Sequence, residues 1–312
     1  MQVFDSPATM QAYSTAQRVA GRRIGLVPTM GALHPGHLAL VAAARRTADV
    51  IVVSIFVNPM QFNRRDDFDT YPRPIDDDLA LCRSHGVDAV YAPTAAAMYP
   101  AGFETSVEPG SLATPLEGAA RPGHFRGVTT VVTKLFNAVR PDVAVFGRKD
   151  FQQLAIIRRM TIDLDMGITI VGLDTIREPD GVAMSSRNRR LSVQDRAAAM
   201  CIPRALSAAA DLLAGGERRV SALLAAARVV LDREPRARVE YLDCIDPETL
   251  QPVAVLSGDV LSGQVLSGEV LSGDVLSGET GVIVAAVWFG DVRLIDNRLL
   301  RSVEQRPSVE NA

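Results

Sequence analysis

Residues 23–57 read RIGLVPTMGALHPGHLALVAAARRTADVIVVSIFV, which is an apolar run, a loop with two glycines, an alanine-rich stretch and a second apolar run. We predict a strand at 23–27, a loop at 28–36, a helix that begins near His37, and a strand rich in β-branched residues at 50–57. A strand, a helix and a second strand in this order are the unit from which parallel sheets are built. This stretch therefore predicts an α/β fold.

The same alternation continues through the first half of the chain and supports a doubly wound parallel sheet. The expected elements are strands at 89–92, 143–146 and 168–173, helices at 128–139 and 151–163, and a helix start at the acidic run 76–78, where carboxylates suit the positive end of the helix dipole.

After residue 190 the sequence changes to alanine-rich helices at about 193–231, followed by strands at 239–244, 282–289 and 292–295. We therefore expect a boundary near residue 175, with a parallel-sheet domain at 1–175 and a smaller α+β domain at 176–312.

Residues 255–279 are five tandem pentapeptides, VLSGD, VLSGQ, VLSGE, VLSGD and VLSGE. A solenoid must bury a continuous core, and short units that each contain Ser-Gly offer little apolar area. We expect an expanded loop between two strands, because the entropy of loop closure grows slowly with length. A short β-coil or a self-association site is the alternative.

Bulk properties exclude several classes of protein. The chain has 312 residues, is 47% hydrophobic and 22% charged, and carries a formal charge of -3, so neither disorder nor a basic field for nucleic acid or an anionic membrane is indicated. Cys82, Cys201 and Cys244 form no C-x-x-C pair, which fits a reducing cytoplasm. No export leader is apparent, and apolar runs such as 51–57 are too short to span a bilayer.

The first candidate motif is PTMGALHPGH at 28–37. A loop that enters a helix at the carboxyl edge of a parallel sheet offers N–H groups and a helix dipole to an anion. Gly31 and Gly36 allow a close approach of the backbone, and His34 and His37 can point to one side. We favour a nucleotidyl-transfer site over a simple pair of helix-capping histidines. Zinc is disfavoured, because a third ligand and the H-E-x-x-H form are missing.

Two further motifs suit the same phosphates. GRKDFQQ at 147–153 again joins a strand to a helix, and Lys149 can reach a phosphate, although an exposed lysine is the simpler alternative. MSSRN at 184–188 follows Asp180-Gly181 and combines two hydroxyls with a guanidinium, although a helix-capping Ser-Ser turn would look similar.

Seven blocks in this order resemble the pantothenate synthetase family of the H-x-G-H nucleotidyltransferase superfamily. They are PTMGALHPGH, VSIFVNPMQF, YPRPIDDDL, HFRGVTTVVTKLFN, FGRKDFQQL, DGVAMSSRN and RLIDN. The resemblance implies a Rossmann-like domain that binds ATP and pantoate, a C-terminal domain that covers the site, and a homodimer built through the N-terminal domain. It also implies that pantoate is adenylated by ATP and then coupled to β-alanine, with Mg²⁺ bound.

The resemblance also implies roles for individual residues. His34, His37, Lys149, Ser185, Ser186 and Arg187 would act on the phosphates, with His37 as proton donor. Gln61 and Gln153 would bind pantoate or β-alanine, and Asn58 would support that wall. The ATP site would comprise Met30, Gly31, Ala32, Leu33, His34, Pro35, Gly36, His37, Gly147, Arg148, Lys149, Asp150, Ile176, Met184, Ser185, Ser186 and Arg187.

Three features depart from the family pattern. Arg148 stands where the family commonly has Glu, and the pentapeptide array is foreign to it. A magnesium site found in some relatives would use Asp77 and Asp78, but Leu81 replaces its third ligand.

The chemistry needs no enzyme nucleophile, because the substrate carboxylate can attack the α-phosphorus directly, and preorganised charges stabilise the transition state. No residue is identified as the base for the amine of β-alanine. A different H-x-G-H enzyme that adenylates a phosphorylated acceptor, a tRNA synthetase and a non-catalytic nucleotide-binding module remain the alternatives.

Overall fold

The computed structural model describes residues 1–256 and 279–301. The loop expectation for the pentapeptides at 255–279 therefore lies almost wholly outside the described residues. The chain forms two compact units: residues 1–178 with 183–189, and residues 179–182 with the described residues from Arg190 onward.

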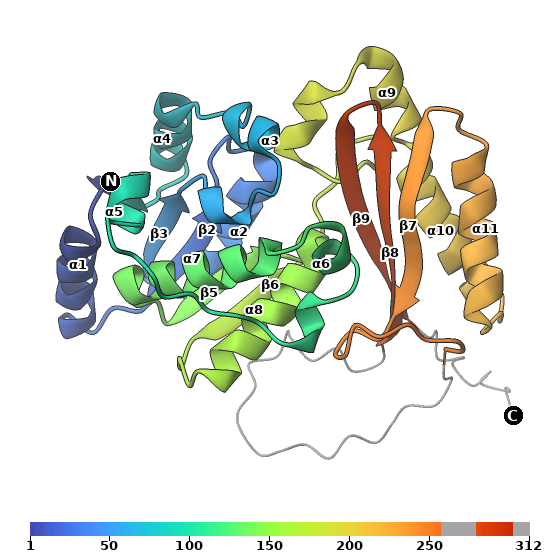
Figure 1. Cartoon of the computed structure of the whole chain (residues 1–312). Coiled ribbons are helices and arrows are strands. Elements are labelled where there is room, and N and C mark those ends of the chain that lie inside the picture. The colour runs from blue at the N-terminus through green and yellow to red at the C-terminus, as the bar shows by residue number, and fades with distance from the viewer. Residues whose placement is uncertain (257–278, 302–312) are drawn as a thin grey trace, which may run out of the picture. The chain divides into compact units, whose positions relative to one another are not determined.

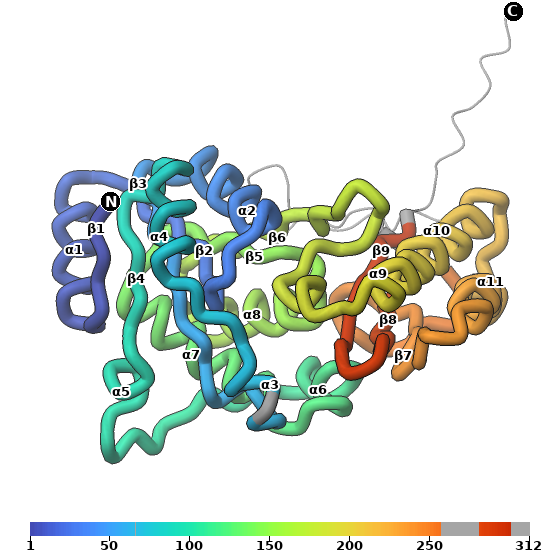
Figure 2. The backbone as a smooth tube through the Cα atoms, turned by 90° about the horizontal axis from the view of Figure 1, so that it is seen from above, coloured from blue at the N-terminus to red at the C-terminus, as the bar shows by residue number. Residues whose placement is uncertain are grey.

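Six parallel strands make the sheet of the first unit, in the order β1-β4-β3-β2-β5-β6. Figure 1 labels β2, β3, β5 and β6 of this sheet, and Figure 2 also labels β1 and β4. Their bounds are β1 Gln2–Phe4, β2 Ile24–Thr29, β3 Val50–Ile55, β4 Ala89–Tyr91, β5 Val143–Gly147 and β6 Thr169–Leu173. The order runs from β2 through β3 and β4 on one side and through β5 and β6 on the other, so it reverses between β2 and β5. Doubly wound sheets bind ligands at the carboxyl ends of strands at such a reversal.

Helices cover both faces of this sheet. One face carries α1 Pro7–Val19, α7 His124–Val139 and α8 Phe151–Asp163, and the other carries α2 Pro35–Arg45 and α4 Ile75–Ser84. The shorter helices are α3 Arg65–Asp69, α5 Ala95–Met98, α6 Glu117–Ala120, η1 Pro59–Gln61, η2 Ser111–Ala113, η3 Arg148–Asp150 and η4 Ser186–Arg190.

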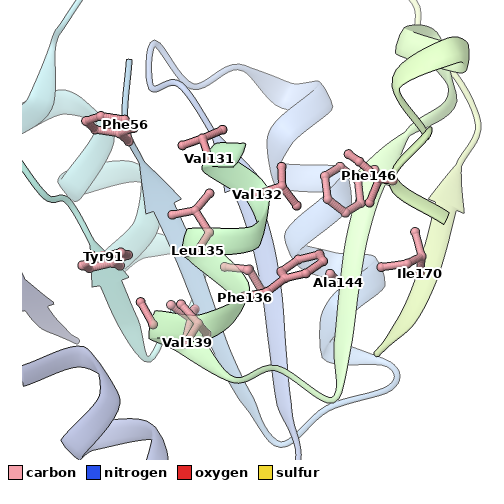
Figure 3. Close-up of a cluster of buried hydrophobic side chains, with 14 of the residues drawn as sticks. Phe56, Tyr91, Val131, Val132, Leu135, Phe136, Val139, Ala144, Phe146 and Ile170 are labelled. Atoms are coloured by element: carbon pink, nitrogen blue, oxygen red, sulfur yellow. The ribbon is translucent and has the colours of Figure 1, made fainter. Parts of the chain in front are cut away.

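The alternation of side chains along the strands separates two cores. Val50 and Val52 of β3 lie in the core under α7, whereas Ile51 and Val53 lie in the core under α2. Figure 3 shows the first of these cores, in which Phe136 and its neighbours on α7 lie over the strands. Because both faces are buried, the strands are continuous apolar runs, which is why they were visible in the sequence.

The second unit is an antiparallel sheet packed on helices. Its strands, in the order β7-β8-β9, are Ala237–Ile245, Glu279–Phe289 and Val292–Arg301, and its helices are α9 Val193–Ala198, α10 Cys201–Ala214 and α11 Val220–Asp232. Apolar residues of α10, α11 and the sheet share one core. The α/β fold with a smaller α+β part is therefore confirmed.

Strand β1 and helix α1 were not predicted, and neither were the short helices α3, α5 and α6. Strand β1 pairs with β4 at the edge of the sheet, and α1 follows it there (Figure 2).

Among the described residues, one helical stretch, 193–214, is long and apolar enough to suit a membrane span. Most of this stretch is α10, whose Leu206 and Leu213 are buried in the second core, so α10 is a core helix.

Candidate active site

A cavity opens at the reversal of strand order, beside the loops that follow β2 and β5. All the residues that line it belong to the first unit. Its lining includes these predicted site residues: Met30, His34, Gly36, His37, Asn58, Gln61, Gly147, Lys149, Asp150, Gln153, Ile176, Met184, Ser185, Ser186 and Arg187. The first motif lies more than a hundred residues before the other two in the sequence. All three motifs therefore meet around one cavity.

His34 and His37 lie at the start of α2 with ring centroids 4.0 Å apart. The Nδ1 atom of His37 accepts from the backbone N–H of His34 at 3.3 Å, and Nδ1 of His34 accepts from the N–H of Gly36 at 3.2 Å. A Cβ on residue 36 would lie 2.9 Å from the His34 ring, so glycine is needed there for the ring to pack. The histidines thus cap the helix and line the cavity at once.

Both imidazoles are neutral at physiological pH. Burial, and then the positive charges of Lys149 and Arg189, lower the pKa of His34 to about 4. Burial, and then His34 and Lys149, lower the pKa of His37 to about 3. Because Nδ1 of each ring accepts from an N–H, the single ring proton is on Nε2, where it can be donated to an anion.

The middle of this loop faces away from the cavity. Gly31, Ala32, Leu33 and Pro35, which were predicted to line the ATP site, are not among its lining residues. Ala32 and Leu33 are buried, and their N–H groups donate to the carboxylate of Asp78 at 2.8 and 2.7 Å.

Lys149 lies in the short helix η3 that follows β5, and it is half-buried in the lining of the cavity. Arg148 does not line the cavity. It is buried, and its Nη1 donates to Oδ1 of Asp174 at 2.9 Å. Asp174, Thr175 and Ile176 follow β6 and do line the cavity, so Arg148 contacts the site through Asp174.

The Ser-Ser-Arg segment contacts the segment that follows η1. The hydroxyls of Ser186 and Tyr71 are 3.3 Å apart, and Nη2 of Arg187 donates to Oδ2 of Asp67 at 3.1 Å. The backbone N–H of Met184 donates to the carbonyl of Ile176 at 2.9 Å, which joins this segment to the strand end beside Arg148.

The side chain of Gln61 is held by Asn58. The Nδ2 of Asn58 donates to Oε1 of Gln61 at 3.0 Å, and the hydroxyl of Tyr99 donates to Oδ1 of Asn58 at 2.8 Å. The Nε2 of Gln61 lies 3.2 Å from the sulfur of Met30. Gln61 is therefore preoriented at the edge of the first motif.

The two glutamines of the KDFQQ segment have different environments. Gln153 lines the cavity. Gln152 is buried, where it accepts from the N–H of Glu117 at 3.0 Å and donates to the carbonyls of Leu112 and Pro115 at 2.9 and 2.8 Å.

Sequence reasoning assigned no role to several residues that line the cavity. His124 donates from Nδ1 to the carbonyl of Gln61 at 2.8 Å, and Nη2 of Arg121 donates to the same oxygen at 3.1 Å. Burial, and then Arg121, lower the pKa of His124 to about 4. The sequence feature that could have indicated these two residues is the run R-P-G-H-F-R at 121–126, which leads into the apolar part of α7. The apolar part of the lining includes Phe56, Val128, Val131, Val132, Leu135 and Phe146.

The acidic pair suggested as metal ligands does not suit a metal. Asp77 is exposed, whereas Asp78 is 1% exposed and uses both oxygens on backbone N–H groups. Burial raises the pKa of Asp78, and the two N–H groups partly offset this. In the part of the chain that the structure describes, no three His, Cys, Asp or Glu side chains are grouped to hold a metal ion.

Comparisons with known proteins agree with this geometry. The family model for pantoate–β-alanine ligase matches residues 2–299. A pantothenate synthetase of Geobacter sulfurreducens is 49% identical over 96% of this chain and 99% of its own, and pantothenate synthetase 1 of Bradyrhizobium diazoefficiens is 50% identical over 96% and 98%.

Two solved structures are similar over nearly the whole length. Pantothenate synthetase from Thermus thermophilus superimposes with a TM-score of 0.85 at 39% identity and covers 96% of this chain and 100% of its own. The Francisella tularensis pantoate–β-alanine ligase, solved as a complex with βγ-ATP and β-alanine, has a TM-score of 0.73 at 31% identity, with 96% and 97% covered. The chain therefore belongs to the pantoate–β-alanine ligase family.

Proposed function

We propose that this chain condenses pantoate with β-alanine to give pantothenate, using ATP to form a pantoyl adenylate and releasing AMP and pyrophosphate. It is an ATP-dependent ligase that forms a C–N bond. The observation that carries the proposal is that the loops after β2 and β5 and the 184–187 segment line one cavity together with Gln61 and Gln153.

In the first step, an oxygen of the pantoate carboxylate attacks the α-phosphorus of ATP, and the bond from that phosphorus to the bridging oxygen of pyrophosphate breaks. Negative charge grows on the phosphates. Lys149 and Arg187 supply positive charge, Ser185 and Ser186 supply hydroxyls, and His34 and His37 donate hydrogen bonds. Both imidazoles carry their proton on Nε2, from which they can donate hydrogen bonds to the phosphates.

Other residues of the same lining suit the acid. Pantoate has two hydroxyls and a carbon that bears two methyl groups. The amides of Gln61 and Gln153 can bind the oxygens, and the apolar face of α7, with Val131 and Val132, can accept the methyl groups.

In the second step, the neutral amine of β-alanine attacks the acyl carbon, the bond to the adenylate oxygen breaks, and AMP leaves. Positioning of the amine beside the activated carbonyl can lower the barrier by about 7 kcal/mol or more. A site that limits water protects the adenylate from hydrolysis. No described residue is identified as the base.

Three further parts of the proposal concern the setting of the enzyme. Mg²⁺ would be supplied with the ATP substrate, where it would neutralise phosphate charge, because Asp77 and Asp78 do not suit a metal. The enzyme is cytoplasmic, and it is a homodimer built through the N-terminal unit, as the family resemblance implies. Light scattering after gel filtration tests the dimer, which a monomer mass at micromolar concentration would contradict.

The deciding experiment measures ATP–pyrophosphate exchange with each acceptor. We expect exchange that depends on pantoate, and formation of pantothenate and AMP once β-alanine is added. Exchange that instead required a phosphorylated acceptor would favour the rival enzyme class. Binding of ATP without exchange for any acid would favour a nucleotide-binding module.

A further inference from the structure

The carboxylate of Asp78 makes an unusual set of contacts for an acidic residue at the start of a helix. It lies in the first turn of α4 and is 1% exposed. Its Oδ1 accepts from the N–H of Leu33 at 2.7 Å, and its Oδ2 accepts from the N–H of Ala32 at 2.8 Å. Hydrogen bonds to a buried ionised carboxylate are among the stronger ones in proteins, so this contact fixes the loop after β2.

The loop needs such an anchor because the backbone of Ala32 is strained. Gly31 and Ala32 have φ values of +80° and +49°, which lie in the left-handed region. Alanine enters that region at a cost, and a residue stays there only when its surroundings hold it. The carboxylate of Asp78 bonds the N–H of this alanine and of the residue after it.

The carboxylate also fills the space beside Gly31. A Cβ on residue 31 would lie 2.9 Å from Oδ2 of Asp78 and 3.1 Å from Cγ2 of Ile55. The N–H of Gly31 itself donates to the hydroxyl of Thr29 at 3.1 Å. Residue 31 is therefore enclosed by the groups that hold the loop.

Every backbone N–H from residue 31 to residue 37 has a partner inside the protein. Gly31, Ala32 and Leu33 donate as described, His34 and Gly36 donate to the imidazoles, and His37 donates to the carbonyl of His34 at 2.8 Å. Pro35 has no N–H. The loop therefore presents its imidazole Nε2–H groups to the cavity instead of the cradle of N–H groups that its sequence suggests.

We propose that Asp78 is a positioning residue of the adenylation site, which aims His34 and His37 at the nucleotide by binding the backbone of Ala32 and Leu33. It touches neither substrate nor metal. This inference rests on the proposed function, and it assigns to Asp78 a role different from the metal ligand that its sequence position suggested.

The test compares Asp78→Asn with Asp77→Asn. Both remove one negative charge from the same turn of α4, but Asp77 is exposed. The asparagine oxygen can accept from one N–H, whereas its NH₂ group meets the other. Wild type and both variants are assayed for pantoate-dependent exchange at varied ATP, pantoate and Mg²⁺, and for binding of a non-hydrolysable ATP analogue by calorimetry.

We expect Asp78→Asn to raise the KM for ATP and the Kd of the analogue by about 10-fold or more, with the KM for pantoate within about twofold of wild type. Asp77→Asn should resemble wild type in both. If Asp78→Asn acted only by partial unfolding, kcat would fall because less enzyme is active, while the KM for ATP and the KM for pantoate would both stay near wild type. That result would contradict the proposal. If the variants at 77 and 78 were alike, or if both raised the half-saturating Mg²⁺ severalfold, the proposal would be wrong.

Two further measurements cover the cases in which the first comparison would fail. If Asp78→Asn does not fold, Gly31→Ala crowds the same carboxylate from the loop side and should give the same ATP-selective defect; a normal KM for ATP in that variant would overturn the proposal. If wild type shows no pantoate-dependent exchange, the proposed function fails, but the calorimetric comparison at 77 and 78 still decides the role of Asp78.

Discussion

The backbone N–H of His34 donates to Nδ1 of His37 at 3.3 Å, and the two rings lie 4.0 Å apart. A backbone N–H can only donate, so Nδ1 of His37 must be unprotonated. Both motif histidines therefore carry their proton on Nε2. His124 is the opposite case, because its Nδ1 contacts the carbonyl of Gln61 and must donate to it.

This arrangement predicts the tautomers and the charge of three histidines. The pKa values of His34, His37 and His124 are lowered to about 4, 3 and 4, so each ring stays neutral as the pH falls through 6.5; His34 and His124 gain a proton only near pH 4, and His37 only near pH 3. The chain has four histidines, so each imidazole signal can be assigned with a His→Gln variant. Nitrogen-15 NMR between pH 8 and 5 should show Nε2–H rings for His34 and His37 and an Nδ1–H ring for His124. A midpoint near 6.5 for His34 or His37 would contradict the account.

The glutamine pair predicts two separable effects. Gln153→Ala should raise the KM for pantoate by about 10-fold or more without a change in the unfolding free energy, because this side chain lines the cavity. Gln152→Ala should lower the unfolding free energy by about 2 kcal/mol or more, because it leaves a buried N–H and two carbonyls without their partner. Urea denaturation and steady-state kinetics of both variants check this. Reversal of the two phenotypes would mean that Gln152 is the substrate residue.

Arg148, where the family commonly has Glu, predicts a defect specific to the nucleotide. Arg148→Glu would place a carboxylate beside Asp174, at a position that is buried. Repulsion should displace the 174–176 segment of the lining and raise the KM for ATP about 10-fold, with the KM for pantoate little changed. Arg148→Lys, which keeps the charge, is the control and should have a smaller effect. Equal kinetics of Arg148→Glu and wild type would show that this ion pair does not position the segment.

Much of the fold could be predicted because its strands are buried on both faces and so are continuous apolar runs. Strand β1 has only three residues, and α1 begins with a Ser6 cap but no marked apolar stripe, so both were missed. The placement of His34 and Lys149 in one cavity followed from the position of their motifs at strand ends, whereas Ser186 belongs to a polar loop that lies beyond the end of β6.

Contacts between distant residues could not be predicted in the same way. Asp78 looked like one of three equivalent acids in a helix start, and only the folded chain brings it to Ala32 and Leu33, about 45 positions earlier. The same holds for Arg121 and His124, which bind the carbonyl of Gln61. Sequence spacing alone does not report such pairs.

The lysines offer a matched pair of variants, because the chain contains only Lys134 and Lys149. Lys149→Ala should lower pantoate-dependent exchange at least about 100-fold, because it removes the positive charge that stabilises the negative charge growing on the phosphates. His37→Ala should do the same. Lys134, which lies over the rings of Tyr99 and Phe103, is the control, and Lys134→Ala should stay within about threefold of wild type. Near-normal exchange by Lys149→Ala would remove this lysine from its role.

The most direct measurement of whether the three loops surround one triphosphate uses an acyl-phosphate derivative of ATP, which acylates lysines beside the bound phosphates. Peptide mass spectrometry should find Lys149 acylated and protected by excess ATP, with Lys134 unmodified. Equal labelling of both lysines, or labelling of Lys149 that ATP does not suppress, would contradict the account.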